Sequence, residues 1–248
     1  MGFKLELINN EIFKSAFESI EKIVDDVNIH IDSEGFHINA IDRSHICFVS
    51  LDLNKEFFDE FECDVAEKIC IDTIDLMKIL KRMKKTDVLC LSVEDETNNL
   101  ILNFKGDVDR EFKIRLIDAS YEAPPLPNIV LPVGVKLPSS ILNDCLNDMQ
   151  LFNDNLTFTI DNEYFIASAD GEFGDSEVKY LHGEHITDTV QASFTIDKLA
   201  DMMKSSKFSD EVKISMDNDK PLRLDFELVT EDGILSFLLA PRLSNDDE

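Results

Sequence analysis

The basic side chains of this sequence are concentrated where they could form a cationic surface. The stretch 78–85 (KILKRMKK) holds five lysines and arginines, although the 248-residue chain has a formal net charge of −27. A uniformly acidic protein is repelled by nucleic acid, because the phosphates form a dense polyanion. A chain that gathers its cations in one place can approach a polyanion, or an acidic partner, through that surface alone.

Other groups of reactive side chains give little indication of catalysis. His182 and His185 have a metal-like spacing, but they lack the H-E-x-x-H order and a third ligand nearby. The acidic turns at 170–177 and 217–219 do not match a calcium loop, and there is no phosphate-binding loop or nucleophile elbow. We therefore expect no enzyme activity, no metal site and no cofactor. The alternative in this class is an acidic metal-dependent hydrolase, which would need Asp170 or Asp175.

The cysteines and the hydropathy pattern indicate a cytoplasmic protein. The sequence has five cysteines, an odd number: Cys47, Cys63, Cys70, Cys90 and Cys145. They never occur as C-x-x-C, and four of the five lie in apolar patterns. We interpret them as reduced core thiols. No apolar run reaches the roughly 18 residues of a membrane span, and the first residues lack a secretory signal pattern.

The elements that must position the basic residues follow one plan twice. Apolar residues at helical spacing predict two helices in each half: about 12–20 and 72–84, then 139–150 and 196–204. Alternating patterns predict strands at 3–7, 29–31, 35–41, 46–53, 88–93, 99–104 and 111–116, and again at 133–137, 156–160, 164–169, 176–181, 212–216, 222–229 and 234–239. This composition predicts an α+β fold in which two helices per half pack on one face of a largely antiparallel sheet.

The two halves also correspond residue by residue. Leu76, Leu80, Lys81 and Asp87 match residues exactly 123 positions later, and 112–116 matches 235–239 at the same offset. Between the halves, 118–132 has four prolines in fifteen residues, which favours an extended linker over a strand. We therefore predict a half at 1–117, a linker at 118–132 and a second half at 133–248.

Several segments together carry a resemblance to a known family. They are AIDRSHICFVSL (40–51), IDLMKILKRMKK (74–85), RLID (115–118), SADGEFGD (168–175) and LSFLLAPRL (235–243). The whole chain resembles the proliferating-cell-nuclear-antigen type of DNA sliding clamp, most closely its archaeal branch. The resemblance implies a duplicated, ring-forming clamp fold in which three head-to-tail subunits enclose a hole lined by helices. It further implies an archaeal-type cell and a polymerase processivity factor at the nucleoid.

The resemblance implies that helix cations face double-stranded DNA without reading its bases, so that binding depends strongly on salt. The DNA-facing candidates are Lys14, Lys22, Lys78, Lys81, Lys198, Lys204 and Lys207. Glu18, Glu21 and Asp197 lie on the same predicted faces, and the helix at 139–150 has no cation. The inner wall should therefore be less positive than in more basic members of the family.

A head-to-tail ring needs two different, complementary patches on each subunit. The resemblance implies that Arg82, Lys84 and Arg110 meet Asp144 and Asp148 of the next subunit, with the edge strand at 110–116 beside the neighbour's strand at 175–181. Further interface candidates are Phe112, Ile114, Val178 and Tyr180. Solvated helix faces remain the alternative interpretation of these charges.

The resemblance also implies an apolar groove for short partner peptides called PIP boxes. Its candidates are Ile41, His45, Ile46, Phe48, Pro124, Leu126, Pro127, Pro221, Leu238, Leu239, Ala240, Pro241 and Arg242. Leu238 stands where several relatives have tyrosine. A turn histidine at position 45 and an ordinary strand end at LLAP remain open alternatives.

The expected partners are double-stranded DNA, identical chains in a homotrimer, a clamp loader of the replication factor C type, DNA polymerase, flap endonuclease and DNA ligase. Two alternatives stay open: a subunit of a heterotrimeric or checkpoint-type ring, and a peptide-binding scaffold with no role on DNA. Both halves of the expected interface are present on this one chain, which favours self-assembly.

Overall fold

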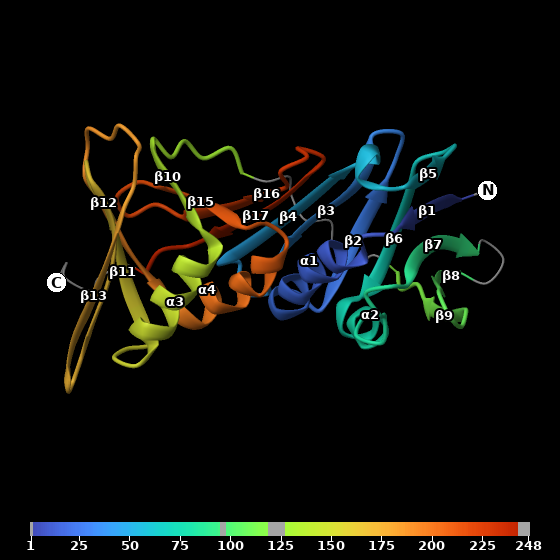
Figure 1. The fold of residues 1–248 in the computed structure, drawn as a ribbon, viewed down its shortest axis with the longest axis horizontal. Coiled ribbons are helices and arrows are strands. Elements are labelled where there is room, and N and C mark those ends of the chain that lie inside the picture. Colours follow the sequence, from blue (N-terminus) through green and yellow to red (C-terminus); the bar gives the residue numbers. More distant parts are fainter. Residues whose placement is uncertain (1, 95–97, 119–126, 243–248) are drawn as a thin grey trace.

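The computed structural model describes residues 2–94, 98–118 and 127–242 of the chain. Within these residues the α-helices lie in a single row along one side of the molecule (Figure 1), where α1 contacts both α2 and α4, and α4 contacts α3. The helices are α1 (Asn10–Ile23), α2 (Thr73–Leu80), α3 (Ser139–Gln150) and α4 (Ile196–Met202), with the 3-10 helices η1 (Lys55–Phe57) and η2 (Met203–Lys207).

The strands of the described residues form three antiparallel sheets. The first has the order β5 (Glu60–Cys63), β1 (Phe3–Leu7), β7 (Val88–Glu94), β8 (Asn99–Lys105) and β9 (Arg110–Arg115). The second has the order β10 (Val133–Pro138), β15 (Glu211–Met216), β16 (Leu222–Glu227), β17 (Gly233–Leu239), β4 (Cys47–Asn54), β3 (Gly35–Ile41), β2 (Asp26–Ile31) and β6 (Glu67–Asp72). The third has the order β13 (Gly174–Leu181), β12 (Tyr164–Gly171), β11 (Asn155–Ile160) and β14 (Val190–Thr195).

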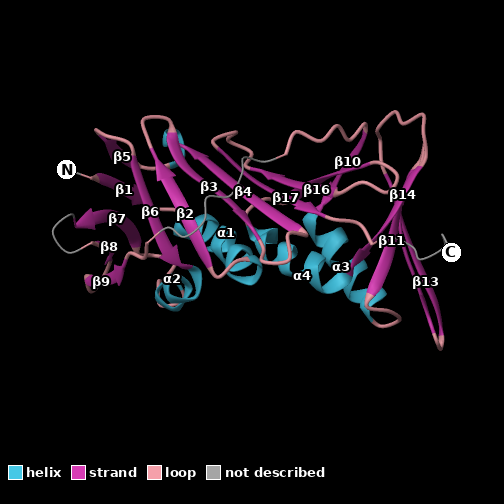
Figure 2. Ribbon diagram, turned by 180° about the vertical axis from the view of Figure 1, so that it is seen from behind, coloured by secondary structure: helices cyan, strands magenta, loops and turns pink. Residues whose placement is uncertain are grey.

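The eight-stranded sheet joins the two halves of the chain. Its junction is the pairing of β17 with β4, in which Ser236 lies opposite Ser50 and Leu238 lies opposite Phe48. Because side chains alternate along a strand, those on one face of this sheet point toward the helices and those on the other face point away from them. The predicted α+β class with helices on one face is correct (Figure 2), but the sheet that runs across both halves was not predicted.

Helix α1 also crosses the boundary between the halves. The Ser19 hydroxyl donates a hydrogen bond to the Met202 carbonyl oxygen at 2.8 Å, and the Ser205 hydroxyl donates to Ser19 Oγ at 2.5 Å. All of these atoms are buried, so the hydroxyls satisfy one another at the seam. The seam fixes α1 against the end of α4 and η2.

The second helix is shorter than its sequence pattern predicts. It ends at Leu80, after which Arg82 N and Met83 N donate to carbonyl oxygens three residues earlier, at 2.8 and 3.1 Å. The basic stretch 78–85 therefore lies partly on a turn rather than wholly on a helix. The strands predicted from the sequence also omit β5, β6 and β14. Strand β5 is only four residues long and β6 begins with two charged residues, but β14 (VQASFT) alternates apolar and polar residues and could have been predicted.

The cysteines are free, and four of the five are buried. Burial raises the pKa of the Cys47 thiol to about 12 and that of Cys145 to about 11, which suppresses the reactive thiolate. Among the described residues, no helix is long and apolar enough to cross a membrane.

One ionisable pair on the eight-stranded sheet makes stability depend on pH. His37 Nδ1 lies 2.9 Å from Asp52 Oδ1 across the β3–β4 pair, and this hydrogen bond raises the histidine pKa above its ordinary value of about 6.5. A histidine whose pKa is higher in the folded state adds to the unfolding free energy at pH values below its unfolded-state pKa. This contribution is lost as the pH rises through the folded-state pKa.

We predict that His37→Gln loses more unfolding free energy, relative to wild type, at about pH 6 than at about pH 8.5. Urea titrations at both pH values measure the difference. The NMR titration of His37 should have its midpoint above 6.5 in wild type and a lower midpoint in Asp52→Asn. If the difference in unfolding free energy between wild type and His37→Gln grew with pH, this assignment would be wrong.

Candidate functional site

The predicted DNA-facing lysines lie on the row of helices. Lys14 and Lys22 are on α1, Lys78 on α2, Lys81 just after it, Lys198 on α4, and Lys204 and Lys207 on η2. Several of them have carboxylate neighbours: Lys78 lies 2.7 Å from Asp75, and Lys81 lies 3.3 Å from Glu21. These lysine ends are well exposed, so each ion pair is weak and can exchange for a phosphate.

A cluster of charges lies where the two halves meet. The carboxyl of Asp201 is partly buried, which raises its pKa, while Lys198, Lys204 and Lys22 oppose that rise. Lys22 belongs to the first half and the other two lysines to the second. The seam therefore gathers three of the candidate lysines around one acidic group.

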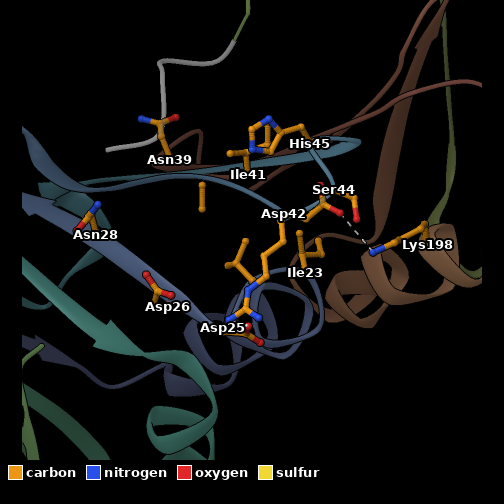
Figure 3. Close-up of a pocket in the computed structure, with 13 residues that line it drawn as sticks. Ile23, Asp25, Asp26, Asn28, Asn39, Ile41, Asp42, Ser44, His45 and Lys198 are labelled. Atoms are coloured by element: carbon orange, nitrogen blue, oxygen red, sulfur yellow. Dashed lines mark ion pairs between the residues drawn. The ribbon is translucent and has the colours of Figure 1, made fainter. Parts of the chain in front are cut away.

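Lys198, a DNA-facing candidate from the sequence, has an ion-pair partner within the chain. Its ammonium nitrogen lies 3.6 Å from Oδ2 of Asp42, a buried carboxylate in the other half of the chain (Figure 3). The other oxygen of Asp42 accepts hydrogen bonds from Ile46 N at 2.8 Å and Cys47 N at 2.9 Å. Asp42 therefore fixes the β3–β4 turn and binds α4 to it.

A pocket of about 500 Å³ opens beside this turn (Figure 3). At its rim the guanidinium of Arg43 lies 2.7 Å from the Asp25 carboxylate, and His45 has a φ of 57°, in the left-handed region. The lining residues are Ile23, Val24, Asp25, Asp26, Asn28, Asn39, Ala40, Ile41, Asp42, Arg43, Ser44, His45 and Lys198. Only Ile41, His45 and Lys198 were candidates from sequence, because a pocket between distant segments leaves no local pattern.

Three apolar groove candidates lie side by side across the eight-stranded sheet. Ile41 pairs with Phe48, and Phe48 pairs with Leu238. Phe48 and Leu238 are 4% and 5% exposed, yet neither belongs to the main hydrophobic core. Ile46 is 41% exposed, and its carbonyl oxygen accepts a hydrogen bond from Ala240 N at 2.8 Å. These side chains form an apolar band on the sheet face that does not carry the core.

Other groove candidates need correction or lie elsewhere. Leu239 packs in the hydrophobic core, because strand alternation points it away from Leu238. Arg242 is tied to the four-stranded sheet: its N donates to Ser193 O at 2.8 Å and its side chain to Asn155 Oδ1 at 2.9 Å. Pro127 is exposed, whereas Pro221 and Pro241 are half-buried. The remaining candidates, Pro124 and Leu126, lie outside the described residues.

The expected interface elements lie at opposite ends of the molecule (Figure 1). Strand β9 is the last strand of the five-stranded sheet, and β13 is the last strand of the four-stranded sheet. The carboxylates of Asp144 and Asp148 are exposed on α3, and Arg82 and Lys84 are exposed beyond α2. The chain thus presents an acidic helix beside one free edge and a basic turn beside the other.

Some interface candidates are occupied within the chain. Phe112 packs on the Phe104 ring with centroids 5.1 Å apart, and Ile114 is buried in the core. Arg110, expected from the sequence to meet a neighbouring subunit, forms an ion pair with Asp87 within the chain. Val178 and Tyr180 are half-buried on β13, packed against the core.

The possible metal motif has a structural role. His182 is buried, its Nε2 lies 3.0 Å from the Asp161 carbonyl oxygen, and its Nδ1 accepts a hydrogen bond from Glu184 N at 3.3 Å. Both ring nitrogens are therefore used locally. In the parts of the chain that the structure describes, no three His, Cys, Asp or Glu side chains are grouped as metal ligands.

Taken together, a duplicated α+β chain with one row of helices and complementary ends has the architecture of a clamp subunit. Family models for the proliferating cell nuclear antigen N-terminal and C-terminal domains match residues 2–123 and 125–242. The chain belongs to the proliferating cell nuclear antigen family.

Individual relatives agree with this assignment. The chain is 49% identical to a protein of Methanobrevibacter smithii named DNA polymerase sliding clamp, over 99% of this chain and all of the relative. It is 44% identical to a protein of the same name from Methanothermobacter thermautotrophicus, with the same coverage. Among solved structures, proliferating cell nuclear antigen from Thermococcus kodakaraensis superposes with a TM-score of 0.90 at 26% identity, over 97% of this chain and all of that one.

The buried Asp42 carboxylate generates a stability prediction. Asp42→Ala should lower the unfolding free energy by about 2–4 kcal/mol, because two backbone N–H groups and the Lys198 ammonium lose their acceptor. Chemical denaturation measures the loss. Asp170→Ala is the matched control: this exposed residue lies near the end of β12, at the sequence position that matches Asp42 in the second half, and should change stability by about 0.5 kcal/mol or less. Equal losses in the two variants would remove the special role of Asp42.

Proposed function

We propose that this protein is a DNA polymerase sliding clamp that works as a ring of three identical chains around duplex DNA. The observation that carries the proposal is the pair of free sheet edges, β9 and β13, at opposite ends of one subunit. An open edge of this kind favours pairing with another chain, and two different edges favour head-to-tail assembly. The relatives named as sliding clamps support the same function.

The junction inside the chain indicates how copies would join. The halves meet through antiparallel pairing of β17 with β4. In the duplicated plan, β9 is the counterpart of β17. Strand β13 follows β12 in the second half as β4 follows β3 in the first. Pairing of β9 with the β13 strand of a second copy would repeat this junction between chains. The acidic α3 of one copy would then meet the basic turn of the next.

In such a ring the helices would line the hole. Their lysines would contact phosphates rather than bases, so affinity would be independent of sequence and would fall with added salt. Carboxylates beside Lys78, Lys81 and Lys198 reduce the free positive charge. Weak, exchangeable contacts of this kind suit a ring that slides.

The apolar band on the opposite sheet face would bind partners. A helical turn carrying an aromatic anchor could pack over Ile41, Ile46, Phe48 and Leu238. We propose DNA polymerase, flap endonuclease, DNA ligase and a clamp loader of the replication factor C type as these partners, in the cytoplasm at the nucleoid. The protein itself would be a tether with no catalysis and no cofactor.

Ring closure is tested by mass. In sedimentation equilibrium at low salt, wild type should have about three times the 28.2 kDa of one chain, with smaller species appearing as salt screens the contact. Asp148→Lys should shift the population toward smaller species, because it places a cation opposite the basic turn. Asp197→Lys makes the same charge change at an exposed residue of α4; it is the control and should leave the mass unchanged. A single-chain mass for wild type at micromolar concentration would contradict the ring.

Peptide binding is tested separately. Ile46→Glu should weaken binding of a synthetic PIP-box peptide at least about tenfold in calorimetry, because it places a charge in the apolar band. Ile74→Glu is the matched control, since Ile74 on α2 is also 41% exposed. It should leave peptide affinity unchanged. Equal effects in both variants would indicate that the peptide binds elsewhere.

A further inference from the structure

We propose that Asp87 is the positioning residue for the basic half of the ring contact, an inference that rests on the proposed function. Its side chain is only 4% exposed and lies between the turn that follows α2 and the free edge strand β9. These two segments carry all three of the interface cations expected from sequence: Arg82, Lys84 and Arg110.

One carboxylate contacts both segments. Asp87 Oδ2 accepts a hydrogen bond from Lys84 N at 2.7 Å and forms an ion pair with the guanidinium of Arg110. Arg110 in turn donates from Nη1 to the Arg82 carbonyl oxygen at 2.9 Å and lies over the Phe104 ring, 5.2 Å from its centroid. The three cationic residues therefore belong to one network with Asp87 at its centre.

The first residue of α1 supports the same turn. The Asn10 side chain is buried and donates from Nδ2 to the Lys84 carbonyl oxygen at 3.0 Å and to the Asp87 carbonyl oxygen at 2.5 Å. The turn is thus held from the helix side by Asn10 and from the strand side by Arg110. A cation on a fixed backbone loses less freedom when it meets a partner than one on a loose loop.

The network changes the role of Arg110. Its guanidinium is committed to Asp87, the Arg82 carbonyl and an aromatic face, and its side chain is only 27% exposed. Of the three interface cations expected from the sequence, Arg82 and Lys84 are the two whose side chains stay exposed. Arg110 therefore holds the edge strand and the turn together. The groups that reach the carboxylates of the next subunit, Asp144 and Asp148, are Arg82 and Lys84.

The second half of the chain provides an internal comparison. Asp210 occupies the position that matches Asp87, and its carbonyl oxygen accepts a hydrogen bond from Ser139 N at 2.8 Å, at the start of α3. Its side chain is exposed, and within the described residues its carboxylate has no hydrogen bond or ion pair. The strand corresponding to β9 there is β17, which is already paired with β4.

In both repeats the carbonyl oxygen at this position therefore accepts a hydrogen bond from the first residue of a helix, the Asn10 side chain in α1 and Ser139 N in α3. Within the described residues, the carboxylate network occurs only in the first half, where the edge strand is open. A feature needed simply to fold the repeat would be expected in both halves. Its restriction to the open edge ties Asp87 to assembly.

The test compares Asp87→Asn with Asp210→Asn in the full chain. We expect Asp87→Asn to raise the dissociation constant of the ring at least about tenfold, while Asp210→Asn leaves it within about twofold. Sedimentation at several concentrations and one moderate salt measures both. Urea unfolding at salt where wild type is dissociated reports whether the subunit itself has lost stability.

A double-mutant cycle separates positioning from general weakening. If Asp87 acts through the cations that meet Asp148, the losses from Asp87→Asn and Asp148→Asn should be strongly non-additive. Additive losses would overturn the inference, as would an unchanged dissociation constant for Asp87→Asn. A wild-type chain that never associates would instead overturn the proposed function.

Arg110→Lys keeps the charge and gives a second test if Asp87→Asn folds poorly. Lysine lacks the planar fork that reaches Asp87 and the Arg82 carbonyl together. If Arg110 positions the turn, this variant should raise the dissociation constant of the ring at least about tenfold. A direct charge contact from Arg110 predicts little change, and that result would overturn the inference.

Discussion

The backbone hydrogen bonds at the edges of the sheets constrain the rest of this structure. An edge strand leaves N–H and C=O groups that must pair with another strand, a covering segment or water. Two edges are covered within the chain: Ile117 N donates to Cys70 O of β6 at 3.0 Å, and Arg242 N donates to Ser193 O of β14 at 2.8 Å. The edges of β9 and β13 instead point away from the molecule at its two ends. This difference turns a duplicated fold into a subunit suited to assembly.

Two buried carboxylates determine which partners some of the basic side chains have within the chain. Asp42 holds a turn and binds Lys198 across the boundary between halves, and Asp87 holds another turn and binds Arg110. A buried carboxylate is stable only with several donors, so each one fixes the backbone and the cation around it. In a chain of net charge −27, this means that acidic residues organise the basic surface as well as opposing it.

The two faces of the eight-stranded sheet have separate tasks because strand alternation keeps their side chains apart. Leu239 and Cys47 pack toward the core, while their neighbours Leu238 and Phe48 form the apolar band on the other face. The helices cover only the core side. A peptide on one face and a polyanion along the helices could therefore bind without competing for the same side chains.

The sequence by itself determined the repeated plan, the helix at Ser139–Gln150, most strands and the resemblance to the clamp family, because these depend on local periodicity and motifs. It also placed cations near 78–85, but it could not show that α2 ends at Leu80 or that Lys198 and Arg110 are already paired. Those features depend on contacts between residues far apart in the chain, such as Asp42 with Lys198. Only the tertiary structure decided them, because a buried charge takes whichever partner the packing brings within reach.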